Sequence, residues 1–153
     1  MKYAAIDIGT NTVLMTVVEK SEGFREVLDV ATITRLGQGL KATGVLSDEA
    51  MQRTFEALRG YRVTAESNSV RELYCVGTAA LREARNSHVF TEMVRRELGF
   101  SVRVISERDE AFYTYLSVRH DLSSRGLKNF IVIDIGGGST EIITGDPDHF
   151  KDF

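Results

Sequence analysis

Cysteine is almost missing from this sequence of 153 residues, in which Cys75 stands alone. A single thiol excludes an internal disulfide and fits a reducing compartment, so we expect a cytoplasmic protein. Long apolar runs are also missing, and none approaches the roughly 18 residues that a membrane-spanning helix needs. An acid at Asp7 comes too early for a secretory signal peptide.

The sequence also lacks a large excess of positive or negative charge. The sequence has 19 basic and 22 acidic residues, for a formal net charge of -3. This balance gives no sign of a nucleic-acid partner or of a membrane surface. With 42% hydrophobic residues, the chain can bury the core of about one domain, and a second full domain would not fit.

The sequence is organised around its last apolar run, residues 130–135. The run contains one acid, Asp134, and is followed by Gly136-Gly137-Gly138-Ser139-Thr140-Glu141. This pattern predicts a buried strand whose tip turns sharply and leaves backbone N–H groups uncovered. Such a turn can hold phosphate.

The same plan occurs near the amino terminus. There an apolar strand with the acid Asp7 leads through Ile8 into Gly9-Thr10-Asn11-Thr12. Glycine followed by hydroxyl and amide side chains again predicts a turn rich in hydrogen-bond donors. Two such turns suggest two arms of one anion site.

The first part of the chain favours strands. Residues 3–8 and 13–18 are apolar and predict a hairpin, and residues 25–36 mix β-branched residues with charges, as a more exposed third strand does. Two glycines then break the pattern at residues 35–40, and we expect residues 41–46 to form a mobile loop.

Helices and strands alternate after that loop. Ser47 is a good N-cap for a helix that Gly60 weakens without ending, and Ser87 should cap a second helix that Gly99 stops. A third helix should begin at Ser106. Strands are expected at residues 73–76 and 102–105, and a second hairpin at 130–135 and 141–144.

This order predicts an α/β fold with a ribonuclease-H-like mixed sheet covered by helices on both faces. We expect the carboxyl ends of its strands, with Gly9, Gly77 and Ile105, to gather at one edge of the sheet. The first domain should span residues 1–128, and residues 129–153 should begin a second, truncated domain.

Five motifs, in this order, resemble the exopolyphosphatase and guanosine pentaphosphate phosphohydrolase family, which belongs to the actin-like ATPase superfamily. They are Asp7 to Thr12, Arg35 to Leu40, Thr78 to Ala84, Ile105-Ser106 with Asp109-Glu110-Ala111, and Asp134 to Glu141. Members of that family are longer and have a second ribonuclease-H-like domain, so the resemblance implies that this chain is a fragment.

The resemblance also implies chemistry. Hydrolysis of a terminal phosphoanhydride in polyphosphate or guanosine pentaphosphate needs donors for phosphate oxygens, a divalent metal and a base that activates water. Glu110 would be the base, and Arg82 would hold phosphate together with both turns. Asp7, Asp134 and Glu141 offer hard oxygen ligands for Mg²⁺ or Mn²⁺.

Each of these roles has a structural alternative. Asp7 could simply end a strand, and Arg82 could pair on the surface with Glu83. Ser106 and Asp109 form an S-x-x-D capping box, and Glu110 could only complement the helix dipole. The sequence also departs from the family at Glu107, where glycine is usual, and at Asp109, where glutamate is commoner.

Three functions stay open at this point. The chain could be part of such a phosphohydrolase, a relative of nucleotide-dependent sugar or acetate kinases, or a polyanion-binding module without catalysis. The extra motifs at residues 35–40 and 105–111 favour the phosphohydrolase. The strand at residues 130–135 is apolar on both sides, so we also expect an exposed patch and a homodimer.

Overall fold

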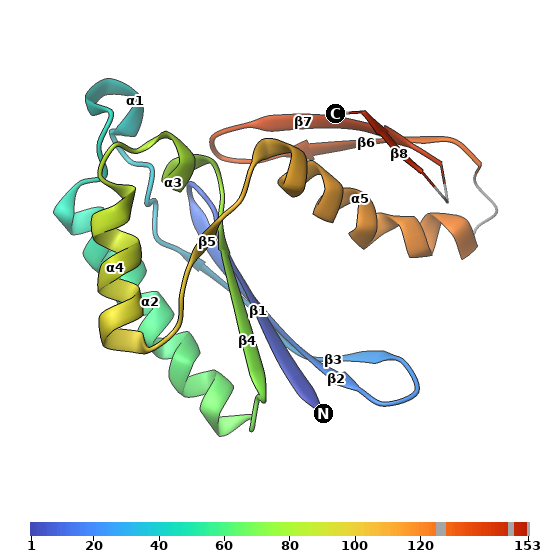
Figure 1. The fold of residues 1–153 in the computed structure, drawn as a ribbon, viewed down its shortest axis with the longest axis horizontal. Coiled ribbons are helices and arrows are strands. Elements are labelled where there is room, and N and C mark those ends of the chain that lie inside the picture. Colours follow the sequence, from blue (N-terminus) through green and yellow to red (C-terminus); the bar gives the residue numbers. More distant parts are fainter. Residues whose placement is uncertain (125–127, 147–148, 153) are drawn as a thin grey trace. The chain divides into compact units, whose positions relative to one another are not determined.

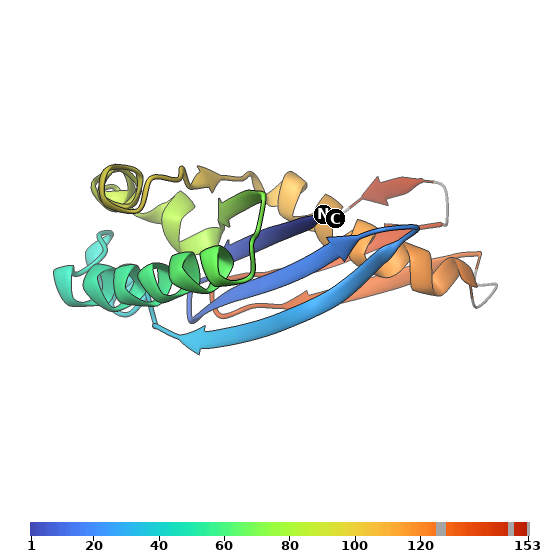
Figure 2. The ribbon, with the colours of Figure 1, turned by 90° about the horizontal axis from the view of Figure 1, so that it is seen from below.

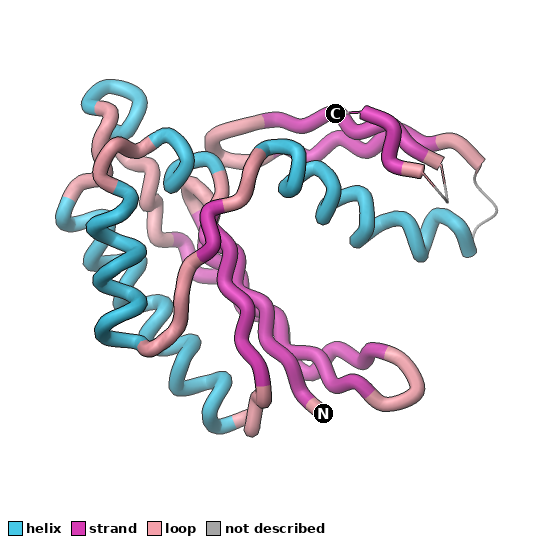
Figure 3. The backbone as a smooth tube through the Cα atoms, in the orientation of Figure 1, coloured by secondary structure: helices cyan, strands magenta, loops and turns pink. Residues whose placement is uncertain are grey.

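The computed structural model describes residues 1–124, 128–146 and 149–152 (Figure 1). Backbone contacts divide the chain into two compact units, Met1–Val104 and Ile105–Phe153, which we call unit 1 and unit 2. Figure 3 shows that each unit contains both helix and strand. Within the described residues, no helix combines the length and hydrophobicity needed to cross a bilayer.

Unit 1 is built on a five-stranded sheet in the order β3-β2-β1-β4-β5. Strands β1, β2 and β3 pair antiparallel, whereas β4 pairs parallel with both β1 and β5. Figure 2 shows β3 at the edge beside β2. The predicted mixed sheet is therefore confirmed. The strands are Lys2–Ile8 (β1), Thr12–Lys20 (β2), Phe24–Ile33 (β3), Glu72–Gly77 (β4) and Arg103–Val104 (β5).

Helices α2 (Asp48–Ser67) and α4 (Ser87–Leu98) lie on the same side of this sheet (Figure 1). Alternate residues of β1 and β2 face them, so that Ile6 and Met15 are fully buried in the core. From α2, the Tyr61 hydroxyl donates to the carbonyl oxygen of Val13 at 3.0 Å and forms a second hydrogen bond, of 2.8 Å, with the Thr32 hydroxyl. These bonds fix α2 on β2 and β3.

Local details of unit 1 differ from the prediction at two short helices. Residues 41–46 were expected to be a mobile loop, but α1 covers Leu40–Thr43. Gly39 and Gly44 bracket it in the left-handed conformation, and Leu40 and Leu46 anchor it in the core. The short helix α3, Ala79–Glu83, was not predicted.

Two element ends were also wrong. The third strand stops at Ile33 instead of Leu36, because the next residues turn to hydrogen-bond the β1–β2 loop. The N-cap of α4 is Asn86 and not Ser87. The Asn86 side chain makes two bonds with the backbone of Leu46, of 2.8 and 2.9 Å, so tertiary contact decides its place.

Unit 2 consists of α5 (Glu107–Ser124) and an antiparallel sheet in the order β6-β7-β8, with strands Phe130–Ile135, Thr140–Gly145 and Phe150–Asp152. The predicted second hairpin is confirmed. Tyr115 of α5 stacks on Phe130 with ring centroids 6.0 Å apart and contacts Phe150 at 5.7 Å. These contacts group α5 with the hairpin, whereas the sequence placed it in a first domain ending at residue 128.

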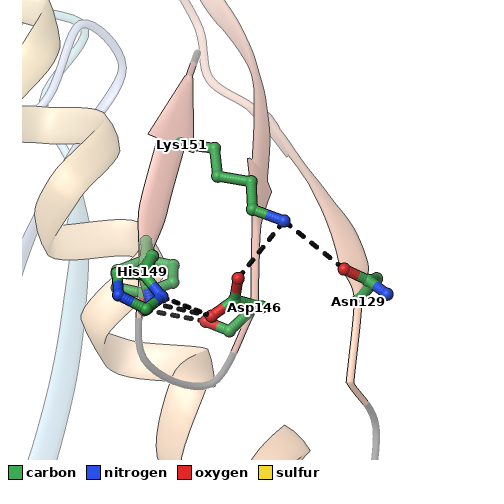
Figure 4. A network of polar contacts seen from close by, with 5 residues as sticks. Asn129, Asp146, His149 and Lys151 are labelled. Carbon is green, nitrogen blue, oxygen red and sulfur yellow. Dashed lines mark hydrogen bonds and ion pairs between the residues drawn. The ribbon is translucent and has the colours of Figure 1, made fainter.

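Asp146, directly after β7, bonds to residues just before β8 and within it (Figure 4). Its Oδ1 accepts the backbone N–H of His149 at 2.9 Å, and its Oδ2 lies 3.2 Å from Lys151 Nζ. Lys151 also reaches Asn129 Oδ1 at 3.4 Å. These contacts tie β8 to the start of β6.

The face of β6 and β7 that turns away from α5 is apolar and exposed. Ile131, Ile133, Ile135 and Ile142 are each more than half exposed. The exposed patch predicted from the sequence is therefore present.

Candidate active site

The predicted edge of unit 1 is formed by the carboxyl ends of three parallel strands. Ile8 of β1 is in register with Gly77 of β4, and Gly77 is in register with Val104 of β5. Thr78 donates its backbone N–H to the carbonyl oxygen of Ile8 at 3.2 Å. The expectation that these strand ends gather at one edge is confirmed.

The first predicted phosphate turn, Gly9 to Thr12, leaves this edge as the tight β1–β2 connection. Gly9 N–H donates to the carbonyl oxygen of Thr12 at 3.0 Å. A Cβ at Gly9 would lie only 3.0 Å from the same oxygen, so the tight approach favours glycine. Just before the turn, Oδ1 of Asp7 is buried.

A second segment holds that turn in place. The carbonyl oxygen of Asn11 accepts the N–H groups of Thr34 and Arg35 at 2.9 and 2.8 Å, and that of Thr10 accepts the N–H of Gly37 at 2.9 Å. Arg35 adopts a positive φ of 52°, which is uncommon for a residue with a side chain. We call these bonds the turn clamp. These bonds use the carbonyl oxygens of Thr10 and Asn11, so the backbone N–H groups of those two residues are left to other acceptors, whereas that of Gly9 is already bonded to Thr12.

Helix α2 stabilises the turn clamp through Arg53. Arg53 donates through Nε to the carbonyl oxygen of Thr34 at 3.1 Å and through Nη2 to Gln38 Oε1 at 3.0 Å. Sequence reasoning gave the motif at residues 35–40 no role. Its two glycines were the available signal, since a Cβ at Gly37 would collide with the methyl group of Thr10.

Arg82, the predicted phosphate-binding arginine, lies half-buried in α3. This helix follows β4 directly because Gly77 allows Leu81 to pack against its backbone, where a Cβ would collide with the Leu81 side chain. Arg82 therefore starts from the same sheet edge as the Gly9–Thr12 turn.

Cys75 lies in β4 on the buried side of the sheet, with 5% of the residue exposed. Burial, followed by the nearby charge of Asp7, raises the pKa of its thiol well above the ordinary range. The thiol therefore behaves as a core side chain at neutral pH, as the sequence indicated.

The second predicted phosphate turn, in unit 2, repeats the geometry of the first. Gly136 N–H donates to the carbonyl oxygen of Ser139 at 3.0 Å, as Gly9 does to Thr12. In both hairpins the acid lies two residues before the glycine, at Asp7 and at Asp134. The repeated plan seen in the sequence therefore corresponds to a repeated backbone turn, which continues through Gly137, Gly138 and Ser139 to Thr140.

Two of the predicted metal ligands face each other across this hairpin. Asp134 of β6 is directly opposite Glu141 of β7, and opposite residues of an antiparallel pair lie on the same face. Glu141 is only 7% exposed, and no described residue forms a hydrogen bond or ion pair with its carboxylate. Two carboxylates in this arrangement repel each other unless a cation lies between them.

Helix α5 brings a third group to this pair. Thr114 Oγ1 donates to Asp134 Oδ2 at 3.0 Å. Glu110, the predicted base, lies four positions earlier in α5, and residues at this spacing share one face of a helix. The half-buried Glu110 therefore lies one helical turn from the residue that contacts Asp134.

The start of α5 also bears on the helix-capping alternative. Ser106 Oγ accepts the N–H of Asp109 at 3.1 Å, so Ser106 is an N-cap. No described residue forms a hydrogen bond with the Asp109 carboxylate, so the return bond that would complete a capping box is not made. The helix starts at Glu107.

These carboxylates fit a magnesium or manganese ion in part. Among the described residues no cluster of three or more His, Cys, Asp or Glu side chains forms. Mg²⁺ commonly takes one or two carboxylates and completes its octahedron with waters and substrate phosphates. Asp134 and the nearly buried Glu141 match that donor set, and Asp7 lies in the other unit.

The predicted site residues thus form two groups. Unit 1 holds Asp7, the Gly9–Thr12 turn and Arg82, and unit 2 holds Glu110, Asp134, the Gly136–Thr140 turn and Glu141. An open groove of about 890 Å³ lies elsewhere, between β3 and α2, and is lined by none of these residues.

Known proteins resemble this chain over almost its whole length. Residues 15–152 match the Ppx/GppA phosphatase family. A guanosine-5'-triphosphate,3'-diphosphate pyrophosphatase of Aliivibrio fischeri is 37% identical over 145 residues, and one of Vibrio parahaemolyticus is 38% identical. Each match covers 94% of this chain and 29% of the relative, so the chain spans less than a third of these proteins.

Solved structures agree. The Ppx/GppA family member of Aquifex aeolicus superposes with a TM-score of 0.87 at 34% identity, over 99% of this chain and 49% of that one. An exopolyphosphatase of Cytophaga hutchinsonii gives 0.88 at 27% identity, over 98% and 48%. The fold, the order of the motifs and the family match lead to one conclusion: this chain belongs to the Ppx/GppA phosphatase family.

Proposed function

We propose that this chain is the amino-terminal part of a phosphohydrolase that removes terminal phosphate from inorganic polyphosphate, guanosine pentaphosphate or both. The observation that carries the proposal is the repeated turn, with Gly9 N–H bonded to Thr12 and Gly136 N–H bonded to Ser139, each two residues after an aspartate. Such a closed turn would offer the backbone N–H groups of the residues after each glycine to the non-bridging oxygens of a polyanion. The names of the relatives support these two substrates.

In this proposal Glu110 accepts a proton from a water molecule as the water oxygen attacks the terminal phosphorus atom. The bond from phosphorus to the bridging oxygen breaks, and the shortened chain leaves with that oxygen. The two turns and Arg82 hold the phosphate oxygens. Asp134 and Glu141, together with Asp7, would hold Mg²⁺ or Mn²⁺, which offsets the negative charge that builds up on the phosphate.

Glu110 is tested in a protein of the relatives' length that contains this sequence. Glu110→Gln keeps the size of the side chain and removes the proton acceptor, and general-base catalysis contributes about 10² to 10⁴ in rate. We expect phosphate release from long-chain polyphosphate to fall by that factor, with substrate binding much less affected. Asp109→Asn is the matched control and should keep its turnover.

The result distinguishes the possibilities. Normal turnover in Glu110→Gln together with loss in Asp109→Asn would place the base on Asp109. If both variants stay active, Glu110 is not the base and only complements the dipole of α5. No phosphate release by the unaltered protein, from polyphosphate or guanosine pentaphosphate, would favour a polyanion-binding module.

Two further features belong to this proposal. We infer a cytoplasmic protein from the lone, buried Cys75, and a homodimer from the exposed isoleucines of β6 and β7. Light scattering on the chain and on Ile133→Thr tests the second. A monomer at every concentration would contradict it, and a dimer that the substitution weakens would support it.

A further inference from the structure

Thr114 occupies an unusual place for a helix hydroxyl. Threonines inside helices commonly bond back to a carbonyl oxygen of the preceding turn, as Thr54 does with Ala50 at 2.8 Å and Thr64 with Gly60 at 2.9 Å. Thr114 instead donates to the Asp134 carboxylate on another element of unit 2. Its hydroxyl therefore orients an acid and does not satisfy its own helix.

The acid that Thr114 contacts needs orientation. Asp134 stands opposite Glu141, whose carboxylate is nearly buried and has no partner among the described residues. The bond to Thr114 engages Oδ2 of Asp134, and no described residue donates to Oδ1. Oδ1 is thus the oxygen that Asp134 can offer to a cation shared with Glu141.

We propose that Thr114 is a positioning residue that fixes Asp134 as a one-oxygen ligand, through Oδ1, of a divalent cation held with Glu141. This inference rests on the metal site of the proposed function. It goes further in assigning a role to a residue of α5, on the same helical face as Glu110. A single hydroxyl then couples the position of the helix that carries the base to the position of the cation ligand.

The physical reason is the geometry of the ligand. A carboxylate that rotates freely presents either oxygen or both, while Mg²⁺ and Mn²⁺ in octahedral sites tolerate little deviation. Residues that hydrogen-bond a metal ligand keep it in the binding orientation, and their loss typically costs 10-fold to 100-fold in metal affinity.

The experiment measures Mn²⁺ binding to the chain by titration calorimetry and by electron paramagnetic resonance of free Mn²⁺. Thr114→Val preserves the shape of the side chain and removes the donor, so Mn²⁺ affinity should fall at least tenfold. Thr114→Ser keeps the hydroxyl and should restore most of it. Ser117→Ala is the control, because Ser117 donates to the backbone oxygen of Thr114 at 2.8 Å and not to Asp134 or Glu141. This variant should bind Mn²⁺ like the unaltered chain.

Thermal unfolding of every variant is measured without metal, so that binding is compared only where the chain is folded. A merely structural role of Thr114 would lower the melting temperature and leave the affinity of the folded chain unchanged, which would overturn the inference. Asp134→Asn distinguishes the existence of the metal site from the role of Thr114 in it. If it abolishes Mn²⁺ binding while Thr114→Val binds normally, the metal site stands and the role of Thr114 is wrong. If the unaltered chain binds no Mn²⁺, both are wrong.

Discussion

The backbone N–H of Arg35 donates a 2.8 Å hydrogen bond to the carbonyl oxygen of Asn11. This bond joins the β1–β2 turn to the segment after β3, and Arg35 adopts a left-handed conformation to make it. A conformation that costs energy persists where the surroundings impose it, and such positions concentrate at functional sites. The turn clamp is therefore part of what shapes the Gly9–Thr12 turn.

Substitution of Gly37 tests the turn clamp. A Cβ in Gly37→Ala would collide with the methyl group of Thr10, so the Thr10 side chain must rotate, the clamp must open or the turn must shift. We expect the free energy of unfolding to fall by about 1 to 3 kcal/mol, as for other overpacked sites. Denaturant unfolding measures this loss. A variant as stable as the unaltered chain would show that the clamp is not rigid.

Gly60→Ala is the matched substitution at a glycine with open space around it. Gly60 lies in the interior of α2, and a Cβ there would meet no atom within 4 Å. Alanine should stabilise the chain by about 0.5 to 1 kcal/mol, because glycine loses more conformational freedom when a helix forms. The two variants should therefore shift the denaturation midpoint in opposite directions, and a shared direction would contradict the difference in the space around these two glycines.

Glu141→Gln should separate charge repulsion from metal binding. Without divalent metal, loss of the charge opposite Asp134 should raise the free energy of unfolding by about 0.2 to 1 kcal/mol. With Mn²⁺ at 100 times its dissociation constant, the unaltered chain should gain about 2.7 kcal/mol, and the variant should gain little. Thermal shifts with and without Mn²⁺ test both parts. Glu26→Gln, on the exposed strand β3, is the control.

If Mn²⁺ stabilises the unaltered chain, Glu141→Gln and Glu26→Gln equally, Glu141 is not a ligand of the metal. A fall in metal-free stability of Glu141→Gln would mean that the Glu141 charge has a stabilising partner, and would contradict the repulsion argued from the register.

The buried Cys75 thiol should make the free energy of unfolding depend on pH in the alkaline range. Burial and the charge of Asp7 raise the pKa of the folded thiol, whereas the thiol of the unfolded chain has a pKa of about 8.5. Below that pH both states carry the proton, and above it only the unfolded state loses it. Stability should then fall as pH rises, with a slope approaching about 1.4 kcal/mol per pH unit from this group.

Denaturant unfolding of the unaltered chain and of Cys75→Ala is measured over about two pH units around the pKa of the unfolded thiol. The difference between the two pH profiles isolates this slope. The same burial predicts that the native thiol reacts with iodoacetamide far more slowly than the unfolded one. Rapid labelling of the folded chain, or identical pH profiles for both proteins, would contradict the buried position of Cys75.

Ser106→Ala tests the start of α5. Loss of its bond to the Asp109 N–H should cost about 1 kcal/mol and speed hydrogen exchange in the first turn, which carries Glu110. Ser47→Ala is the counterpart in unit 1, where Ser47 Oγ accepts the Ala50 N–H at 3.2 Å. Each substitution should increase exchange only in its own helix, and unchanged exchange in α5 would refute the capping role of Ser106.

The sequence alone determined the features that depend on local backbone preference. The glycine turns after Ile8 and Ile135, the N-cap at Ser47 and the stop at Gly99 occur as predicted, because the conformational freedom and hydrogen bonds of these residues are fixed by their own chemistry. The alternation of apolar residues likewise determined the strands and the buried faces of the helices.

Which distant groups meet depends on the packing of the whole chain. Arg35 bonds to Asn11, the Asn86 side chain bonds to the backbone of Leu46, and Thr114 bonds to one oxygen of Asp134. Each of these pairs depends on strand register and helix packing. Register and packing result from many weak contacts between residues far apart in the sequence, so they cannot be predicted from a short stretch of residues. The aromatic packing of Tyr115 on Phe130 groups α5 with the second hairpin for the same reason.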